Sequence, residues 1–150
     1  MKKFRFSLDT VLSYKQQALD ALQGEHAALL QKVHQQEDIV EDCWRRYREC
    51  NEDYHRRAET GLAITEAMFC EASLRASERE IQQETEKLEA LREAAERKRV
   101  EVVEARKETS SIEKLREKKR TDYDKAVAKS EEQAIDEFVS MTRVLQSAGA

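Results

Sequence analysis

The feature that most constrains this chain is a heptad repeat that occurs twice. Counting in alternating steps of three and four from Leu8 to Tyr54, eleven of fourteen positions hold apolar or aromatic residues. The same count from Ala67 to Ile112 meets apolar residues at ten of fourteen positions. Such repeats predict long helices that bury one stripe of side chains against another helix. A surface built in this way contains no catalytic pocket, so we expect a binding function.

The composition favours long helices over a sheet. Charged residues make up 39% of the chain, proline is absent, and only three glycines occur. Runs of β-branched or aromatic residues that would mark strands are missing. We therefore predict an all-α fold, in which two long helices form an antiparallel coiled-coil hairpin and the second helix is longer, with a C-terminal overhang.

We predict a single coiled-coil domain, residues 1–150. The repeat loses phase in one short stretch, which separates the two helices of this domain. We expect helix one over about 7–58, a turn over about 59–65 and helix two over about 66–146. Gly61 lies in the turn, where a residue that tolerates positive φ is useful. Thr65 is placed to cap the second helix.

Both predicted helix starts carry the spacing of a hydrophobic staple. Ser7 is the candidate N-cap of the first helix, with Phe6 and Val11 on either side of it. Ile64 and Phe69 repeat that spacing at the second helix. We expect each pair to pack together at the entry to its helix.

Reversal at the turn sets a register, in which His26 faces Lys98. Gln36 and Glu84 also occupy the repeat, and they gain no polar partner in this register. A register shifted by one heptad is the alternative.

The predicted arms have unequal lengths. In the predicted register the start of helix one lies opposite about residue 117 of helix two. Roughly 28 residues of helix two, each adding ~1.5 Å of length, are then left without a partner. An apolar stripe recurs in this overhang at helical spacing and must be covered by something else. Its members are Ile135, Phe138, Val139, Thr142 and Leu145.

No motif of enzyme chemistry occurs in the chain. A glycine-rich phosphate loop, a nucleophile elbow and paired-cysteine zinc spacing are all missing, so we expect neither catalysis nor a cofactor. Cys50, His55 and Cys70 could approach one another near the turn, but no fourth zinc ligand is evident. Cysteine also packs well in a helical seam, and we predict no metal.

Bulky residues outside the repeat lie on either side of the turn, namely Trp44, Met68 and Phe69. With the edges of Tyr47 and Tyr54 they could form one aromatic patch at the distal tip of the hairpin. Arginines at 45, 46 and 48 give this patch the composition of a binding hot spot. The alternative is that they widen the core where the helices splay.

Charge and hydropathy limit the partners and the compartment. A net charge of −4 disfavours nucleic acid, and no small-molecule substrate is expected. The basic N-terminus is not followed by an apolar stretch, so it does not predict a signal peptide. No apolar run is long enough to cross a membrane, and we expect a cytoplasmic protein.

Two motifs near the ends of the chain point to a known family. Residues 4–15 read FRFSLDTVLSYK, and residues 112–119 read IEKLREKK, followed by Tyr123, Glu131-Glu132 and Ile135-Asp136-Glu137. These segments resemble the opening and the C-terminal signature of the FliJ family of bacterial flagellar export proteins.

The resemblance implies a non-enzymatic coiled-coil stalk that binds the hexameric flagellar export ATPase. It also implies contact with the membrane-embedded export gate, escort of substrate chaperones, and a place at the cytoplasmic face of the inner membrane. Carried onto this chain, the residues that bind the ATPase ring would be Phe4, Phe6, Leu8, Val11, Leu12, Ile135 and Phe138. Those that bind the gate or the chaperones would be Trp44, Tyr47, Met68 and Phe69.

Three other interpretations stay open from the sequence. One is the equivalent stalk of a virulence-type secretion system, whose helices look much the same. Another is a structural spacer that forms a parallel dimer, with the region of Gly61 a stutter in the repeat. The third is an adaptor that binds amphipathic helices of secreted cargo.

Overall fold

The computed structural model describes residues 2–149, and it contains two helices. Helix α1 spans Asp9–Thr60 and helix α2 spans Ile64–Ala148, with lengths of 52 and 85 residues. This confirms the prediction of an all-helical chain in which two long helices pack together and the second is longer. The chain divides into two compact units, which we call the hairpin unit (residues 20–103) and the terminal unit (residues 1–19 with 104–150).

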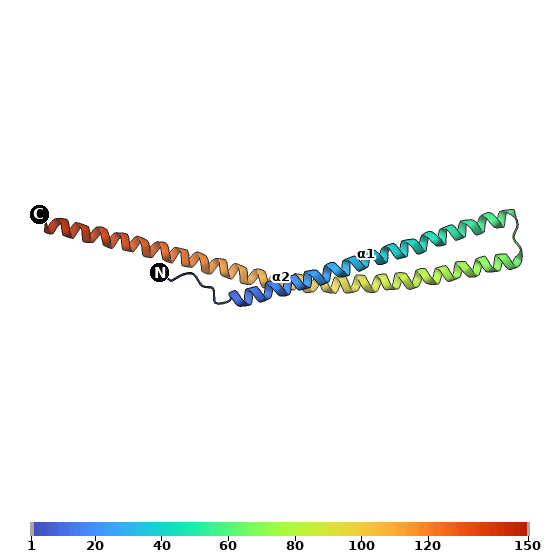
Figure 1. Ribbon diagram of the computed structural model, residues 1–150, viewed down its shortest axis with the longest axis horizontal. Helices are drawn as coiled ribbons and strands as arrows, with labels where there is room; N and C mark the ends of the chain where they lie inside the picture. The colour runs from blue at the N-terminus through green and yellow to red at the C-terminus, as the bar shows by residue number, and fades with distance from the viewer. Residues whose placement is uncertain (1, 150) are drawn as a thin grey trace. The chain divides into compact units, whose positions relative to one another are not determined.

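In the hairpin unit, α1 and α2 lie side by side and run in opposite directions, joined by residues 61–63 (Figure 1). Gly61 has a φ of 103°, the region that glycine adopts without strain. This is the conformation expected from its place in the predicted turn. The Ala67 amide donates to the Ala63 carbonyl at 3.0 Å, so α2 begins before the predicted cap Thr65.

Three of the four residues in the two predicted hydrophobic staples are exposed. At the first helix the Leu12 amide donates to the Leu8 carbonyl at 2.8 Å, which makes Leu8 rather than Ser7 the capping residue. Phe6 is buried, whereas Val11 is 41% exposed. Ile64 and Phe69 are 79% and 74% exposed.

The heptad positions form the interface between the helices. Every repeat position from Leu8 to Tyr54 and from Ala67 to Ile112 is buried or half-buried. In the hairpin unit the centre of this interface is an aliphatic cluster. Its buried members are Val33, Leu88 and Ala95, and Leu29, Val40 and Leu91 pack against them.

Contacts across the hairpin fix the predicted register. Tyr47 is expected opposite Ser77, and its hydroxyl donates to a Glu78 carboxylate oxygen at 3.2 Å. Arg46 reaches Glu80 at 3.1 Å. A shift of one heptad would carry these partners about 10 Å apart along the helices, so the shifted alternative is wrong. The antiparallel pairing within one chain likewise excludes the parallel arrangement without a hairpin.

One polar contact inside this interface corrects the sequence prediction. Gln36 Nε2 donates to the Glu84 carboxylate at 2.6 Å and to the Glu84 backbone carbonyl at 2.9 Å. Gln36 was expected to lack a polar partner, but its long side chain reaches one layer along the seam. His26 and Lys98 do not pair with each other; instead Lys98 Nζ lies 2.9 Å from carboxylate oxygens of both Glu25 and Glu101.

In the terminal unit the first turns of α1 pack on α2. Leu12 is buried here, Lys15 pairs with Glu108 at 2.7 Å, and Arg116 pairs with Asp9 at 3.1 Å. Residues 2–8, which we call the N-terminal segment, continue along α2 beyond the start of α1. Cover for α2 therefore extends further than the residue 117 predicted from the length of helix one.

Candidate functional site

The N-terminal segment is held on α2 by contacts to aromatic rings. The Phe4 and Tyr123 rings have centroids 5.6 Å apart, and the Tyr123 hydroxyl donates to the Lys2 carbonyl at 2.6 Å. The guanidinium groups of Arg120 and Arg116 lie 5.2 Å and 5.8 Å from the centroid of the Phe4 ring. Cation–π contacts of this kind stabilise a partly exposed ring. They explain why a segment without helical hydrogen bonds stays against the helix.

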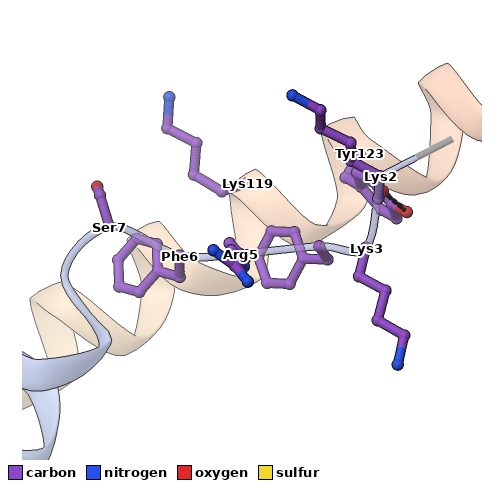
Figure 2. A pocket seen from close by; sticks show the side chains of 8 residues that line it. Lys2, Lys3, Arg5, Phe6, Ser7, Lys119 and Tyr123 are labelled. Atoms are coloured by element: carbon purple, nitrogen blue, oxygen red, sulfur yellow. Dashed lines mark hydrogen bonds between the residues drawn. The ribbon is translucent and has the colours of Figure 1, made fainter.

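An open hollow lies between the N-terminal segment and α2 (Figure 2). Phe4, Phe6, Ser7 and Tyr123 contribute to its lining. The remaining lining residues are all basic, namely Lys2, Lys3, Arg5 and Lys119. Among residues 2–149 no acidic side chain lines it, so the hollow has a strongly positive character.

The residues expected to bind an ATPase ring fall into two groups. Phe6 and Leu12 are buried in the terminal unit, with Phe4 and Leu8 half-buried beside them and Val11 exposed. Ile135 and Phe138 lie on bare helix, 63% and 71% exposed. Because Ile135 follows Tyr123 by twelve residues of α2, about 18 Å of helix at ~1.5 Å per residue separates the groups.

The apolar stripe on the last turns of α2 is uncovered. Sequence reasoning missed Met141, which is 66% exposed and lies three residues after Phe138 on the same side of the helix. Thr142 donates its hydroxyl to the Phe138 carbonyl at 2.8 Å. We call the large apolar members the C-terminal row: Ile135, Phe138, Val139, Met141 and Leu145, all of them exposed.

In the hairpin unit, the structure separates the four residues expected to bind the gate or chaperones into two places. Trp44 packs edge-on against Tyr47, with ring centroids 5.9 Å apart. Tyr54 contacts Glu71, so Met68 and Phe69 lie beyond the level of Tyr54. Trp44 therefore lies about ten residues of α1 away from them, roughly 15 Å at the rise of a helix.

The arginines around Trp44 are engaged with carboxylates. Arg45 pairs with Asp42 at 3.2 Å, and Arg48 pairs with Glu41 at 3.1 Å. Glu78 accepts the hydrogen bond of the Tyr47 hydroxyl and raises the pKa of that phenol. Trp44, 42% exposed, thus forms with Tyr47 an aromatic surface among neutralised charges.

Met68 and Phe69 belong to a second apolar surface of α2. At 100° per residue, they point away from the seam that faces α1. Sequence reasoning assigned Ile64 to a staple and so missed its place in this group. We call this surface the tip face, and its members, all exposed, are Ile64, Met68, Phe69, Ala72 and Ala76.

The three cysteines carry free thiols, and Cys43 is buried in the seam. Within residues 2–149 no three His, Cys, Asp or Glu side chains gather as a metal site, so Cys50, His55 and Cys70 do not form one. In the same range, neither helix has a stretch apolar and long enough to cross a bilayer.

Comparison with known protein families gives a match over most of the chain. A family model described as flagellar FliJ protein matches residues 4–147. No curated protein and no solved structure matches the chain. The match spans nearly the whole sequence, including most of the N-terminal segment, the hairpin unit and the C-terminal row. The chain therefore belongs to the FliJ family of flagellar export proteins.

Proposed function

We propose that this chain is the coiled-coil stalk that binds and stimulates the hexameric flagellar export ATPase. FliJ proteins are non-enzymatic components of the flagellar export apparatus, so the stimulation would require no chemistry from the stalk itself. A rigid helical pair that contacts the subunits of a ring unequally can favour one set of subunit states over another. Faster hydrolysis by the ring is then the expected effect.

The exposed C-terminal row is the observation that carries this proposal. Its five large apolar side chains lie on one helix with no covering element within residues 2–149. Burying such a side chain contributes about 1.5–3 kcal/mol, so a partner that encloses several of them gains substantial binding energy. The interior of a ring can enclose a single helix in this way. We assign ring contact to Ile135 and Phe138, with Phe4, Leu8 and Val11 nearer the N-terminal segment.

Phe6 and Leu12 have a different part in this proposal. Both are less than 10% exposed, so they would support the ring-binding end by holding the N-terminal segment and α1 on α2. Their replacement would then disturb the position of the neighbouring surface residues.

The tip face and Trp44 with Tyr47 are the surfaces that we assign to the cytoplasmic part of the export gate and to substrate chaperones. Exposed aromatic and methionine side chains are frequent anchors in such interfaces. Binding at the gate would place the chain in the cytoplasm, peripherally attached to the inner membrane.

The proposal is tested with the purified flagellar export ATPase from the same source. Full-length chain should increase the rate of ATP hydrolysis, and a chain that ends after Ser130 should not, because it lacks the C-terminal row. Equal stimulation by the two proteins would contradict the assignment of the ring-binding end.

A pair of matched variants separates the loss of the row from a general loss of surface hydrophobicity. The test variant carries Ile135→Ser and Phe138→Ser. The control carries Ile39→Ser and Val100→Ser, two residues of the hairpin unit that are 44% and 48% exposed. The test variant should lose most of the stimulation while the control retains it.

A further inference from the structure

The basic residues of the terminal unit form a surface that the proposed function does not explain. Segments 2–5 and 114–129 contain ten basic and three acidic residues, a net charge of +7. The hairpin unit, with 13 basic and 20 acidic residues, has a net charge of −7. We call the ten basic residues the cationic collar: Lys2, Lys3, Arg5, Lys114, Arg116, Lys118, Lys119, Arg120, Lys125 and Lys129.

Few charges of the cationic collar are neutralised by neighbouring carboxylates. Within residues 2–149 only Arg116 and Arg120 of the ten pair with a carboxylate, Asp9 and Asp124 respectively. In the hairpin unit nine of thirteen basic residues have such a partner. Eight collar charges therefore remain available to a binding partner.

The collar surrounds α2 and does not form a single face. At 100° per residue, Lys118 and Lys125 lie on the side of the helix away from Lys119 and Tyr123. Figure 2 shows the Lys2 and Lys119 ammonium groups on one side of the N-terminal segment and that of Lys3 on the other. A flat anionic surface such as a membrane meets one side of a helix, whereas an encircling partner meets all of them.

We propose that the cationic collar binds carboxylate-rich segments that line the opening of the encircling partner. This inference rests on the proposed function, because it takes the ATPase ring to be that partner. It adds the chemistry of the contact: acidic side chains of the ring pair with the collar, while the C-terminal row makes the apolar contact. Nucleic acid is the less favoured polyanion, because the −7 charge of the hairpin unit would repel it.

Three double variants of the full chain test the proposal, each changing the net charge by the same amount. The near-side variant carries Lys2→Glu and Lys119→Glu, and the far-side variant carries Lys118→Glu and Lys125→Glu. The control carries Lys32→Glu and Arg97→Glu in the hairpin unit, both exposed and without an ion-pair partner among residues 2–149. Helix content measured by circular dichroism verifies that each variant folds.

Binding to the ATPase hexamer is measured for all four proteins at about 50 and 300 mM salt, a range over which screening of exposed charges changes strongly. Near-side and far-side variants should each bind roughly threefold to tenfold more weakly at low salt, as expected for two exposed charge pairs. Both should also show a smaller salt dependence, and the control should stay within about twofold of the original chain.

Loss of binding in only one of the two collar variants, or an equal loss in the control, would overturn the proposal that an acidic partner encircles the collar. Vesicles containing phosphatidylglycerol test the membrane instead. If either collar variant loses vesicle binding while both retain ring binding, the collar belongs to the membrane and the proposal is wrong. Failure of the original chain to bind the hexamer at all would be a different result, because it refutes the proposed function itself.

Discussion

The surroundings of helix α2 differ between the two units, and the difference separates covered side chains from side chains that are open to a partner. In the hairpin unit its apolar stripe faces α1, and most of the basic side chains there have a carboxylate partner. In the terminal unit the helix loses its cover beyond Tyr123, and most of the basic side chains there have none. The same helix thus buries its apolar stripe in one unit and exposes it in the other.

Residue type alone does not mark the difference. Leu88 and Leu145 belong to the same helix, yet they are 5% and 71% exposed. What separates them is whether the fold provides a second element to pack against. Unpartnered surface, rather than any special residue, is the feature that identifies binding regions in a chain of this composition.

Replacing Leu88 and replacing Leu145 should have very different consequences for stability. Leu88→Ala removes a buried side chain that packs with Val33 and Ala95, and we expect it to lower the free energy of unfolding by about 2–4 kcal/mol. Leu145→Ala should change it by less than about 0.5 kcal/mol, since the side chain contacts mainly solvent. Urea denaturation of the two variants measures both values. Similar losses would mean that the C-terminal row is packed in solution.

A smaller effect is expected at the N-terminal segment. Phe4→Ala removes the ring that contacts Tyr123, Arg116 and Arg120, contacts worth about 0.5–1 kcal/mol each when exposed. Trypsin should therefore cleave after Arg5 several-fold faster in the variant, while the melting temperature of the chain stays nearly constant. Phe69→Ala, an exposed aromatic of the tip face, is the control and should leave this cleavage unchanged.

The smallest effect concerns the polar contact within the seam. Gln36 and Lys87 donate to the Glu84 carboxylate and hold its pKa below the ordinary glutamate value. A carboxyl group whose pKa is lower in the folded than in the unfolded chain stabilises the fold at pH values above its unfolded pKa. This stabilisation is lost as the pH falls through the folded pKa. Gln36→Leu should raise the pKa of Glu84 and so reduce the dependence of the melting temperature on pH between about 6 and 3. Carbon-detected NMR titration of Glu84 provides the direct check, and an unchanged pKa would show that Lys87 alone sets it.

The helices and their pairing could be predicted because periodicity reports burial directly. The repeat from Leu8 and the repeat from Ala67 each identified the buried side of a helix, and Gly61 marked the turn. The polar seam contact was missed because Gln36 reaches Glu84 in the next layer, and a position-by-position register does not account for side-chain length. The staple spacing did not foresee that Val11, Ile64 and Phe69 are exposed, because spacing indicates only that two residues could meet.

The candidate sites were only partly predictable. The stripe containing Ile135 and Phe138 could be found, because helical spacing without a partner predicts exposed apolar residues. The cover provided by the N-terminal segment could not, since residues 2–8 have no periodic pattern. The distance between Trp44 and Met68 was also missed, because both lie near the turn in sequence while the rise of a helix separates them.

We propose that the two units serve different partners, and measuring both activities on each of two variants can refute this division. Stimulation of the export ATPase and binding to the cytoplasmic domain of the export gate are measured on two variants of the full chain. One carries Ile135→Ser and Phe138→Ser, and the other carries Met68→Ser and Phe69→Ser. We predict that the first loses ATPase stimulation and keeps gate binding, while the second does the reverse. Loss of both activities in either variant, or of neither in both, would contradict the division of function between the two units.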